Sequence, residues 1–189
     1  MQKFIPILLP VLLIISNAQT IEDSVIDKFG TTRPIPHSVK VKTGLDMLLQ
    51  DSSNPLAGRN LALVTNHSGI DHQENPNYRR LMELPGVNLK VIFSPEHGLF
   101  GEASAGEKVN YDRMRQLPQV VSLYGKTRKP TADMLTGIDL VLYDIQDIGA
   151  RFYTYISTLG LVMEAAAEND IPVWVLDRPN PIGGIWNCN

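Results

Sequence analysis

Short, almost continuous apolar segments alternate with longer amphipathic ones along the chain. The apolar segments cover residues 60–66, 89–93, 120–124, 138–143 and 171–176. Runs of this length are typical of strands that are covered on both faces of a parallel sheet. Helical spacing of apolar residues predicts helices over about 43–50, 78–84 and 152–168, with one helical turn at 131–135. The alternation predicts an α/β fold, a Rossmann-like three-layer arrangement with a mostly parallel sheet.

The first expected helix carries a start signal. Thr43 and Asp46 stand at the spacing of a capping box, in which each side chain accepts a hydrogen bond from the backbone of the other residue. We therefore expect this helix to begin at about residue 43.

Residues 1–18 differ from the rest of the chain. Lys3 is their one charge, Phe4 to Ile15 are almost wholly apolar, and Ser16-Asn17-Ala18 are small or polar. This is the pattern of a signal peptide, and the apolar core is short for a membrane span; the alternative is an uncleaved anchor. Residues 19–40 are expected to form an extended lead-in, and residues 41–189 a single domain. The expected location is secreted or periplasmic.

Composition and charge narrow the function classes. The 189 residues are 43% hydrophobic and carry a formal net charge of −3, with Lys and Arg scattered. This balance disfavours nucleic acid or an anionic membrane surface as a partner. The single cysteine, Cys188, excludes an internal disulfide framework and a cysteine-based zinc site.

Polar residues gather just after four of the apolar segments. They are Thr65-Asn66-His67, Ser94 with Glu96 and His97, Asp144 with Gln146 and Asp147, and Asp177-Arg178 with Asn180. The ends of parallel strands meet at one edge of a sheet, which is where ligands bind in such folds. We therefore expect these four segments to converge on one cleft. Neither a G-x-G-x-x-G nor a P-loop motif occurs, so dinucleotide or nucleotide binding is disfavoured, and no cofactor is expected. No G-x-S-x-G motif occurs either, so the serine mechanism of an α/β-hydrolase lacks its signature.

Glu96 is the leading candidate for catalysis. It lies between Pro95, which cannot donate to a strand ladder, and Gly98 and Gly101, which permit unusual backbone angles. Hydrolysis of a glycoside needs one carboxylic acid beside the leaving oxygen and usually a second carboxylate across the sugar. Glu96 suits such a role; the alternative is a solvated loop residue.

The neighbouring candidates each have two interpretations. His97 either orients Glu96 and a sugar hydroxyl or, with His67, His72 or Asp144, ligates a metal, although no metal-binding spacing occurs and we assign no metal. Asp144 and Asp147 either contact substrate or cap the following helix. Arg151 and Arg178 either bind an anion or pair with Asp147 or Asp177. Tyr153 and Tyr155 either form a stacking wall for a sugar or belong to the core.

Four ordered motifs together resemble a known family. They are 63–69 (LVTNHSG), 93–98 (FSPEHG), 144–155 (DIQDIGARFYTY) and 176–181 (LDRPNP). The chain is similar to the DUF1343 family, whose characterised members are exo-β-N-acetylmuramidases of the NamZ type. The resemblance runs from about residue 40 to 184. It implies a Rossmann-like N-terminal domain, a smaller C-terminal domain, and release of N-acetylmuramic acid from the non-reducing end of peptidoglycan fragments.

The resemblance also implies residue roles. Glu96 matches the proposed catalytic glutamate, and Glu107 is the second choice. The lactyl carboxylate of muramic acid would give Arg151 or Arg178 an anionic partner. The expected substrate-binding set is Asn66, His67, His97, Asp144, Gln146, Asp147, Arg151, Tyr155, Asp177, Arg178 and Asn180.

The family's C-terminal domain would lie beyond Asn189. We therefore expect one wall of the cleft to be missing and apolar surface to be exposed. The sequence leaves open a fragment, a truncated gene model or an inactive paralogue. It also leaves open two other functions, a non-catalytic muropeptide-binding module and a metal-dependent hydrolase.

Overall fold

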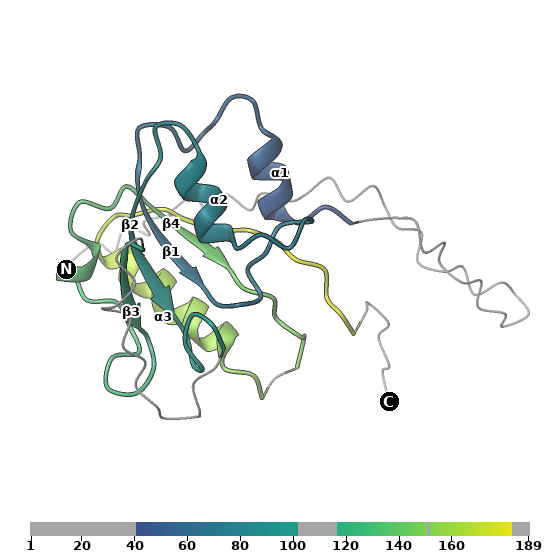
Figure 1. Cartoon of the computed structure of the whole chain (residues 1–189). Coiled ribbons are helices and arrows are strands. Elements are labelled where there is room, and N and C mark those ends of the chain that lie inside the picture. The colour runs from purple at the N-terminus through teal and green to yellow at the C-terminus, as the bar shows by residue number, and fades with distance from the viewer. Residues whose placement is uncertain (1–40, 102–116, 151, 183–189) are drawn as a thin grey trace, which may run out of the picture.

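The centre of the fold is a five-stranded, all-parallel sheet (Figure 1). The computed structural model describes residues 41–101, 117–150 and 152–182. The strands are β1 (Asn60–Thr65), β2 (Asn88–Ser94), β3 (Gln119–Ser122), β4 (Leu140–Asp144) and β5 (Val173–Val175). Their spatial order is β3-β2-β1-β4-β5, which is the order of a Rossmann-like fold. The predicted fold class is therefore confirmed.

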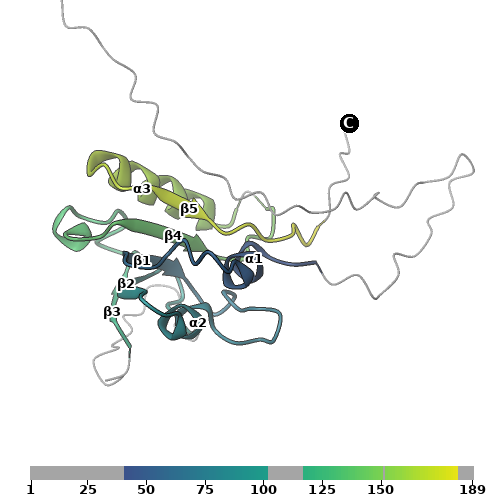
Figure 2. The same ribbon diagram turned by 90° about the horizontal axis from the view of Figure 1, so that it is seen from above.

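Three helices cover the two faces of the sheet. Figure 2 shows α1 (Gly44–Gln50) and α2 (Asn77–Glu83) on one face and α3 (Tyr155–Glu168) on the other. A 3₁₀ turn at Asp133–Leu135 precedes β4. These elements agree with the predicted segments within a few residues at each end. The signal peptide and lead-in predicted for residues 1–40 lie outside the described residues.

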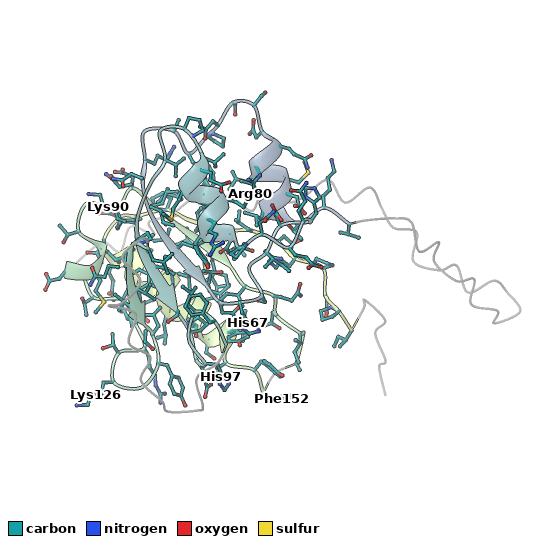
Figure 3. The ribbon with its side chains drawn as sticks, viewed as in Figure 1. His67, Arg80, Lys90, His97, Lys126 and Phe152 are labelled. Carbon is teal, nitrogen blue, oxygen red and sulfur yellow. The ribbon has the colours of Figure 1, made fainter. Side chains whose placement is uncertain are left out.

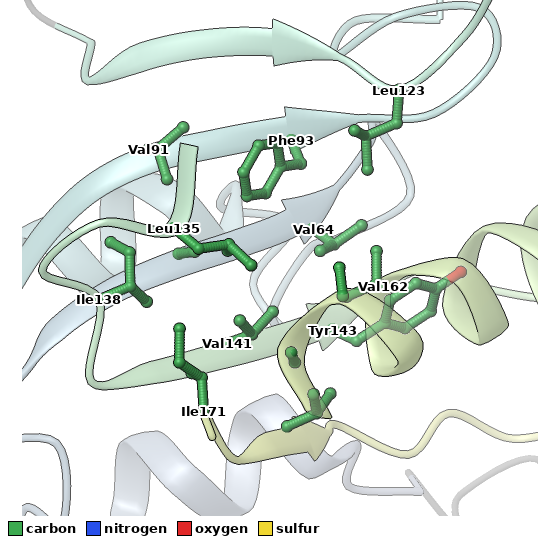
Figure 4. Packing of buried hydrophobic residues seen from close by; sticks show 14 of the residues in the cluster. Val64, Val91, Phe93, Leu123, Leu135, Ile138, Val141, Tyr143, Val162 and Ile171 are labelled. Atoms are coloured by element: carbon green, nitrogen blue, oxygen red, sulfur yellow. The ribbon is translucent and has the colours of Figure 1, made fainter. Parts of the chain in front are cut away.

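The apolar strands are buried because both faces are covered. Every residue of β4 is buried, as are five of the six in β1, whereas no residue of the edge strand β3 is. Side chains alternate between the two faces of a strand. Val64 and Val141 therefore pack toward α3, and Leu63 and Leu142 toward α1 and α2. Figure 4 shows the first of these cores, in which Phe93 of β2 and Val162 of α3 pack with the residues of the central strands.

The predicted capping box at α1 is present and has a further partner. Thr43 accepts a hydrogen bond from the Asp46 N–H at 3.2 Å, and the Asp46 carboxylate accepts from the Thr43 N–H at 2.9 Å. The other Asp46 oxygen accepts from the His72 N–H at 2.9 Å. Burial alone would raise the pKa of Asp46, but the hydrogen bonds from Thr43 and His72 outweigh it and lower the pKa below its ordinary value. Asp46 thus fixes α1 to the segment that follows β1.

The start of α1 also touches the end of β5. The Gly44 N–H donates to the Asp177 carbonyl at 2.7 Å. A Cβ on Gly44 would come within 2.5 Å of the Asp177 nitrogen and 2.8 Å of the Leu176 Cα. Because both neighbours are backbone atoms, this position admits only glycine without movement of the chain.

We predict that Gly44→Ala destabilises the fold although alanine is the better helix former. Helix propensity favours alanine by about 1 kcal/mol, but overpacking typically costs about 1–3 kcal/mol, so we expect a net loss in the free energy of unfolding. The matched control is Gly160→Ala in α3, because no atom of the described residues beyond its chain neighbours and the backbone of its own helix lies within 4 Å of the position a Cβ would take there. We expect the control to gain about 0.5–1 kcal/mol. Urea unfolding measures both, and a Gly44→Ala protein as stable as the parent would contradict the predicted clash.

Candidate active site

The carboxyl ends of β1, β2, β4 and β5 lie at one edge of the sheet, and the following segments contact one another there. The chain order reverses between β1 and β4, which is the switch point where such sheets bind ligands. Gln146 N–H donates to the Ser68 hydroxyl at 2.9 Å, and the Gln146 side chain donates to the Pro179 carbonyl at 2.9 Å. The Thr154 hydroxyl donates to Glu96 at 3.3 Å. The structure therefore brings together segments that are far apart in the sequence.

Glu96 lies on a tight turn after β2. The Gly98 N–H donates to the Pro95 carbonyl at 3.1 Å, and Gly98 has a φ of 75°. His97 also adopts a positive φ, 69°, which costs a residue with a Cβ roughly 1–2 kcal/mol. The sequence indicated unusual backbone angles at Gly98 and Gly101, and both residues have a positive φ. It gave no sign of the positive φ at His97. Strain of this kind occurs where a side chain must be aimed.

The Glu96 carboxylate has a hydrogen-bond donor that the sequence analysis did not identify, the Thr154 hydroxyl. Tyr124 also responds to this carboxylate. The hydrogen bond to Glu96, followed by the charge of that carboxylate, raises the pKa of Tyr124 above its ordinary value. Neither Thr154 nor Tyr124 lies in one of the polar clusters that follow the predicted strands, so the sequence held no direct signal for them.

A pocket of about 210 Å³ opens beside Glu96. It is lined by Glu96, His97, Phe152, Tyr153, Thr154 and Tyr155. The Phe152 and Tyr153 ring centroids are 5.3 Å apart, and those of Tyr153 and Tyr155 are 6.0 Å apart. Figure 3 shows Phe152 and His97 at the same end of the molecule. The pocket therefore has a carboxylate on one side and an aromatic wall on the other.

The members of the aromatic wall differ in exposure. Phe152 is 81% exposed and Tyr153 38% exposed, whereas Tyr155 is buried and also belongs to the core beneath α3. Burial, with smaller effects from Tyr153, Glu96 and Asp147, raises the pKa of Tyr155, and a hydrogen bond with Asn66 opposes the shift. Of the two tyrosines expected to stack on a sugar, Tyr153 is thus the more accessible, and Tyr155 serves both core and pocket.

The residues after β1 flank this site. Asn66 is buried, and its side-chain oxygen accepts from the Ser68 N–H at 2.9 Å and the Ser68 hydroxyl at 2.6 Å. His67 is exposed, and its ring lies against Gly101: a Cβ there would come within 2.4 Å of His67 Nδ1. Figure 3 labels both His67 and His97 in the lower part of the view. These contacts join the ends of β1 and β2.

Asp144 and Arg178 form a buried, bidentate ion pair. Arg178 Nε and Nη2 donate to the two Asp144 oxygens at 2.6 and 3.0 Å, and Nη2 also donates to the Ile70 carbonyl at 3.0 Å. Asn77 Nδ2 donates to Asp144 at 2.7 Å and to the Thr65 hydroxyl at 2.7 Å. Asn77 is fully buried at the start of α2, and nothing in the sequence pattern distinguished it.

This ion pair corrects two of the alternatives drawn from the sequence. The alternative partners for Arg178 were Asp147 and Asp177, but its partner is Asp144. Asp144 and Asp147 were also considered as caps for α3. The N-cap of α3 is Thr154, whose side chain accepts no capping hydrogen bond from the described residues of the helix. Asp144 is fully buried, with both oxygens engaged by protein groups.

Four further predicted site residues line a second pocket, of about 250 Å³. Asp147, Asp177, Arg178 and Asn180 line it together with apolar residues of α3 and β5. Asp147 accepts from the Gly149 N–H at 2.6 Å, and Gln146 donates to the Asp147 carbonyl at 2.7 Å. Some of the residues expected to share one cleft are therefore divided between two pockets, whereas Asn66, His67, Asp144 and Gln146 line neither of them. Glu107 and Arg151 lie outside the described residues.

Metal ligation finds no geometric support in the described part of the chain. In residues 41–101, 117–150 and 152–182, no three His, Cys, Asp or Glu residues are grouped to hold a metal ion. His72, proposed as a co-ligand, contacts Asp46 of α1 at 3.0 Å instead. A search of the same residues finds no helix with the length and apolar character to cross a bilayer.

Comparison with known proteins gives consistent matches. Residues 61–187 match the family model described as exo-β-N-acetylmuramidase NamZ, N-terminal. Over 147 residues the chain is 49% identical to the peptidoglycan β-N-acetylmuramidase NamZ of Bacillus subtilis (strain 168). The aligned region covers 77% of this chain and 35% of that protein. The chain spans about a third of the length of this relative.

Two crystal structures of DUF1343 family proteins from Bacteroides fragilis NCTC 9343 also resemble the fold. The first has a TM-score of 0.68 and is 48% identical in sequence, and the matched region covers 77% of this chain and 36% of the crystallised chain. The second has a TM-score of 0.61 and is 31% identical, and the matched region covers 76% of this chain and 36% of the crystallised chain.

We predict that Arg178→Met lowers the free energy of unfolding by about 3 kcal/mol, because removing one member of a buried ion pair leaves the other charge without compensation. The matched control is Arg79→Met, at an exposed arginine of α2, where we expect a change within about 0.5 kcal/mol. Urea unfolding followed by circular dichroism measures both. Equal stability of the two variants would show that the buried Asp144 carboxylate does not need the charge of Arg178 for the fold to be stable.

Proposed function

The chain belongs to the family of the N-terminal domain of the exo-β-N-acetylmuramidase NamZ, and from this membership we propose that it is a glycoside hydrolase that acts on peptidoglycan-derived saccharides. The proposed reaction is the release of N-acetylmuramic acid from the non-reducing end, with Glu96 as a catalytic carboxylate. The observation that carries the proposal is the position of Glu96, on a strained turn that lines a pocket together with three aromatic residues.

The pocket has the two features that glycoside chemistry needs. A carboxyl group must lie beside the scissile bond, where it exchanges a proton with the leaving oxygen or stabilises the positive charge that develops on the sugar. Exposed aromatic rings give a sugar an apolar face to lie on while its hydroxyls bind polar groups. Phe152 and Tyr153 supply such rings, and His97 is a candidate partner for a hydroxyl. Glu107 remains our proposed second carboxylate.

The lactyl group of muramic acid carries a negative charge and calls for a cation. Arg178 commits Nε and Nη2 to Asp144 and Ile70, and its side chain is 6% exposed. A buried guanidinium already paired with a carboxylate has little attraction left for a second anion. We therefore favour Arg151 over Arg178 as the lactyl-binding residue.

We predict that Glu96→Gln lowers kcat/KM for a chromogenic β-N-acetylmuramide at least about 100-fold, which is the usual loss when a catalytic proton-transfer group is removed. The control is Glu83→Gln, at a glutamate on α2 that pairs with Arg80, and we expect it to leave turnover unchanged. Comparable turnover by the parent and Glu96→Gln proteins would remove Glu96 from the mechanism.

Calorimetry with N-acetylmuramic acid distinguishes catalysis from binding. If the parent protein has no turnover but releases heat on binding, it is a muropeptide-binding module rather than an enzyme. Neither turnover nor heat would overturn the proposed function altogether.

We also propose that residues 1–18 direct export, so the chain acts outside the cytoplasm. The support is the basic start, apolar core and small-residue exit of this segment. When the full chain is expressed in a bacterial host, the exported product should begin at Gln19 on N-terminal sequencing. A cell-retained product that still begins at Met1 would contradict the proposal.

A further inference from the structure

Thr154 departs from the usual role of a threonine at the start of a helix. It is the N-cap residue of α3, where a threonine side chain ordinarily accepts a hydrogen bond from the first turn of its own helix. The Thr154 side chain makes no such bond with the described residues of α3, and its hydroxyl donates instead to Glu96 Oε2 at 3.3 Å. The side chain is therefore committed to the candidate catalytic residue rather than to the helix that it begins.

The backbone around Thr154 is held in a fixed place. The Tyr143 hydroxyl, at the end of β4, donates to the Tyr155 carbonyl at 2.8 Å, and this hydrogen bond is buried. The Thr154 carbonyl accepts from the Thr158 N–H at 3.0 Å and from the Thr158 hydroxyl at 3.3 Å. Val162, further along α3, is buried in the core between the helix and the sheet. The start of α3 can therefore support a side chain that must be held still.

Glu96 approaches Thr154 from a different strand, and its backbone is fixed as well. Ser94, at the end of β2, pairs with β3, and the Gly98 N–H closes the following turn by donating to the Pro95 carbonyl at 3.1 Å. In the sheet β1 lies between β2 and β4, so the hydrogen bond from Thr154 to Glu96 joins the segments that follow two non-adjacent strands. Both residues line the pocket of about 210 Å³.

We propose that Thr154 is a positioning residue, which holds the carboxylate of Glu96 in the orientation that the reaction requires. The inference rests on the proposed catalytic role of Glu96. A free glutamate side chain samples many rotamers, and productive alignment of a catalytic group accounts for a large part of enzymatic rate enhancement. A hydroxyl that donates to an ionised carboxylate forms a charge-assisted hydrogen bond, which restricts this freedom.

A sugar bound in the pocket would strengthen this hydrogen bond. Thr154 is exposed, so water competes for its hydroxyl. A bound sugar excludes that water, and a hydrogen bond gains strength as the local dielectric constant falls. Catalytic hydrogen bonds are often long in the free enzyme and shorten in the complex. The contribution of Thr154 should therefore be seen in kcat rather than in KM.

The kinetic test is Thr154→Val, which keeps the shape of the side chain and removes the hydroxyl. We expect kcat for the chromogenic β-N-acetylmuramide to fall about tenfold, with KM within about twofold of the parent. Thr154→Ser keeps the hydroxyl, so its kcat should lie within about threefold of the parent. A Thr154→Val enzyme with the kcat of the parent, or a Thr154→Ser enzyme as slow as Thr154→Val, would overturn the proposal.

The matched control is Thr136→Val, which makes the same chemical change before the amino end of β4. The exposed Thr136 donates its hydroxyl to the Ala132 carbonyl and lines neither pocket. We expect both kinetic constants of this variant to match those of the parent.

A role in helix capping would be seen in stability instead. Because the Thr154 side chain makes no capping hydrogen bond with the described residues of α3, we expect Thr154→Val to unfold at the urea midpoint of the parent. A lower midpoint with an unchanged kcat would assign the side chain to the helix and overturn the proposal.

A further measurement does not depend on turnover. With the glutamate carboxyl carbons isotopically labelled, the NMR signal of Glu96 is assigned by its absence in Glu96→Gln. Loss of a hydrogen bond changes the shielding of a carboxylate, so this signal should move in Thr154→Val and stay near its parent position in Thr154→Ser. An unmoved signal in Thr154→Val would overturn the hydrogen bond whatever the activity.

The kinetic and NMR measurements separate failure of this inference from failure of the proposed function. A parent protein without turnover, in which the Glu96 signal still responds to Thr154→Val, would retain the hydrogen bond but remove the proposed chemistry and, with it, the positioning role. An active parent in which Thr154→Val changes neither kcat nor the signal would retain the proposed function and remove the positioning role alone.

Discussion

The candidate site depends on the buried ion pair between Asp144 and Arg178. Its bidentate hydrogen bonds tie the end of β4 to the segment after β5, and the bond from Arg178 to Ile70 adds the segment after β1. Asn77 completes the arrangement from the start of α2. Taking two charges out of water is costly, so such a pair is maintained only where its geometry is good and its remaining groups are hydrogen-bonded. Here both conditions are met, and three loop segments have a common fixed point at this edge of the sheet.

The sequence predicted the elements of this fold well because their signals are local. The continuous apolar character of residues 60–66 and 138–143 indicated central parallel strands, and the spacing of Thr43 and Asp46 gave the start of α1. Because the carboxyl ends of parallel strands meet at one edge of a sheet, the parallel arrangement alone predicted where the polar segments lie. What could not be predicted depends on register and loop conformation. The partner of Arg178, the burial of Asn77 and the division of the polar residues between two pockets are all of this kind.

Thr154 and His97 show how the chain departs from local preference around Glu96. A threonine at an N-cap position ordinarily stabilises its own helix, and a histidine ordinarily avoids a positive φ. In this structure the Thr154 hydroxyl donates a hydrogen bond to Glu96. His97, on the turn that carries Glu96, has a backbone φ of 69°. Departures of this kind concentrate at functional sites, because the side chains there are oriented for a ligand rather than for stability. They support the assignment of chemistry to this end of the sheet independently of family membership.

The register of β2 and β3 also determines where the chain tolerates insertions and deletions. Ser94 pairs with Ser122, and the Leu123 N–H donates to the Ser94 carbonyl directly before the turn that carries Glu96. A change in the length of the connection between Gly101 and Leu117 leaves this pairing intact. One residue added inside β2 would instead shift the turn of Glu96 relative to β1 and β3. Homologues of different length should therefore keep the interval from Ser94 to Glu96 constant.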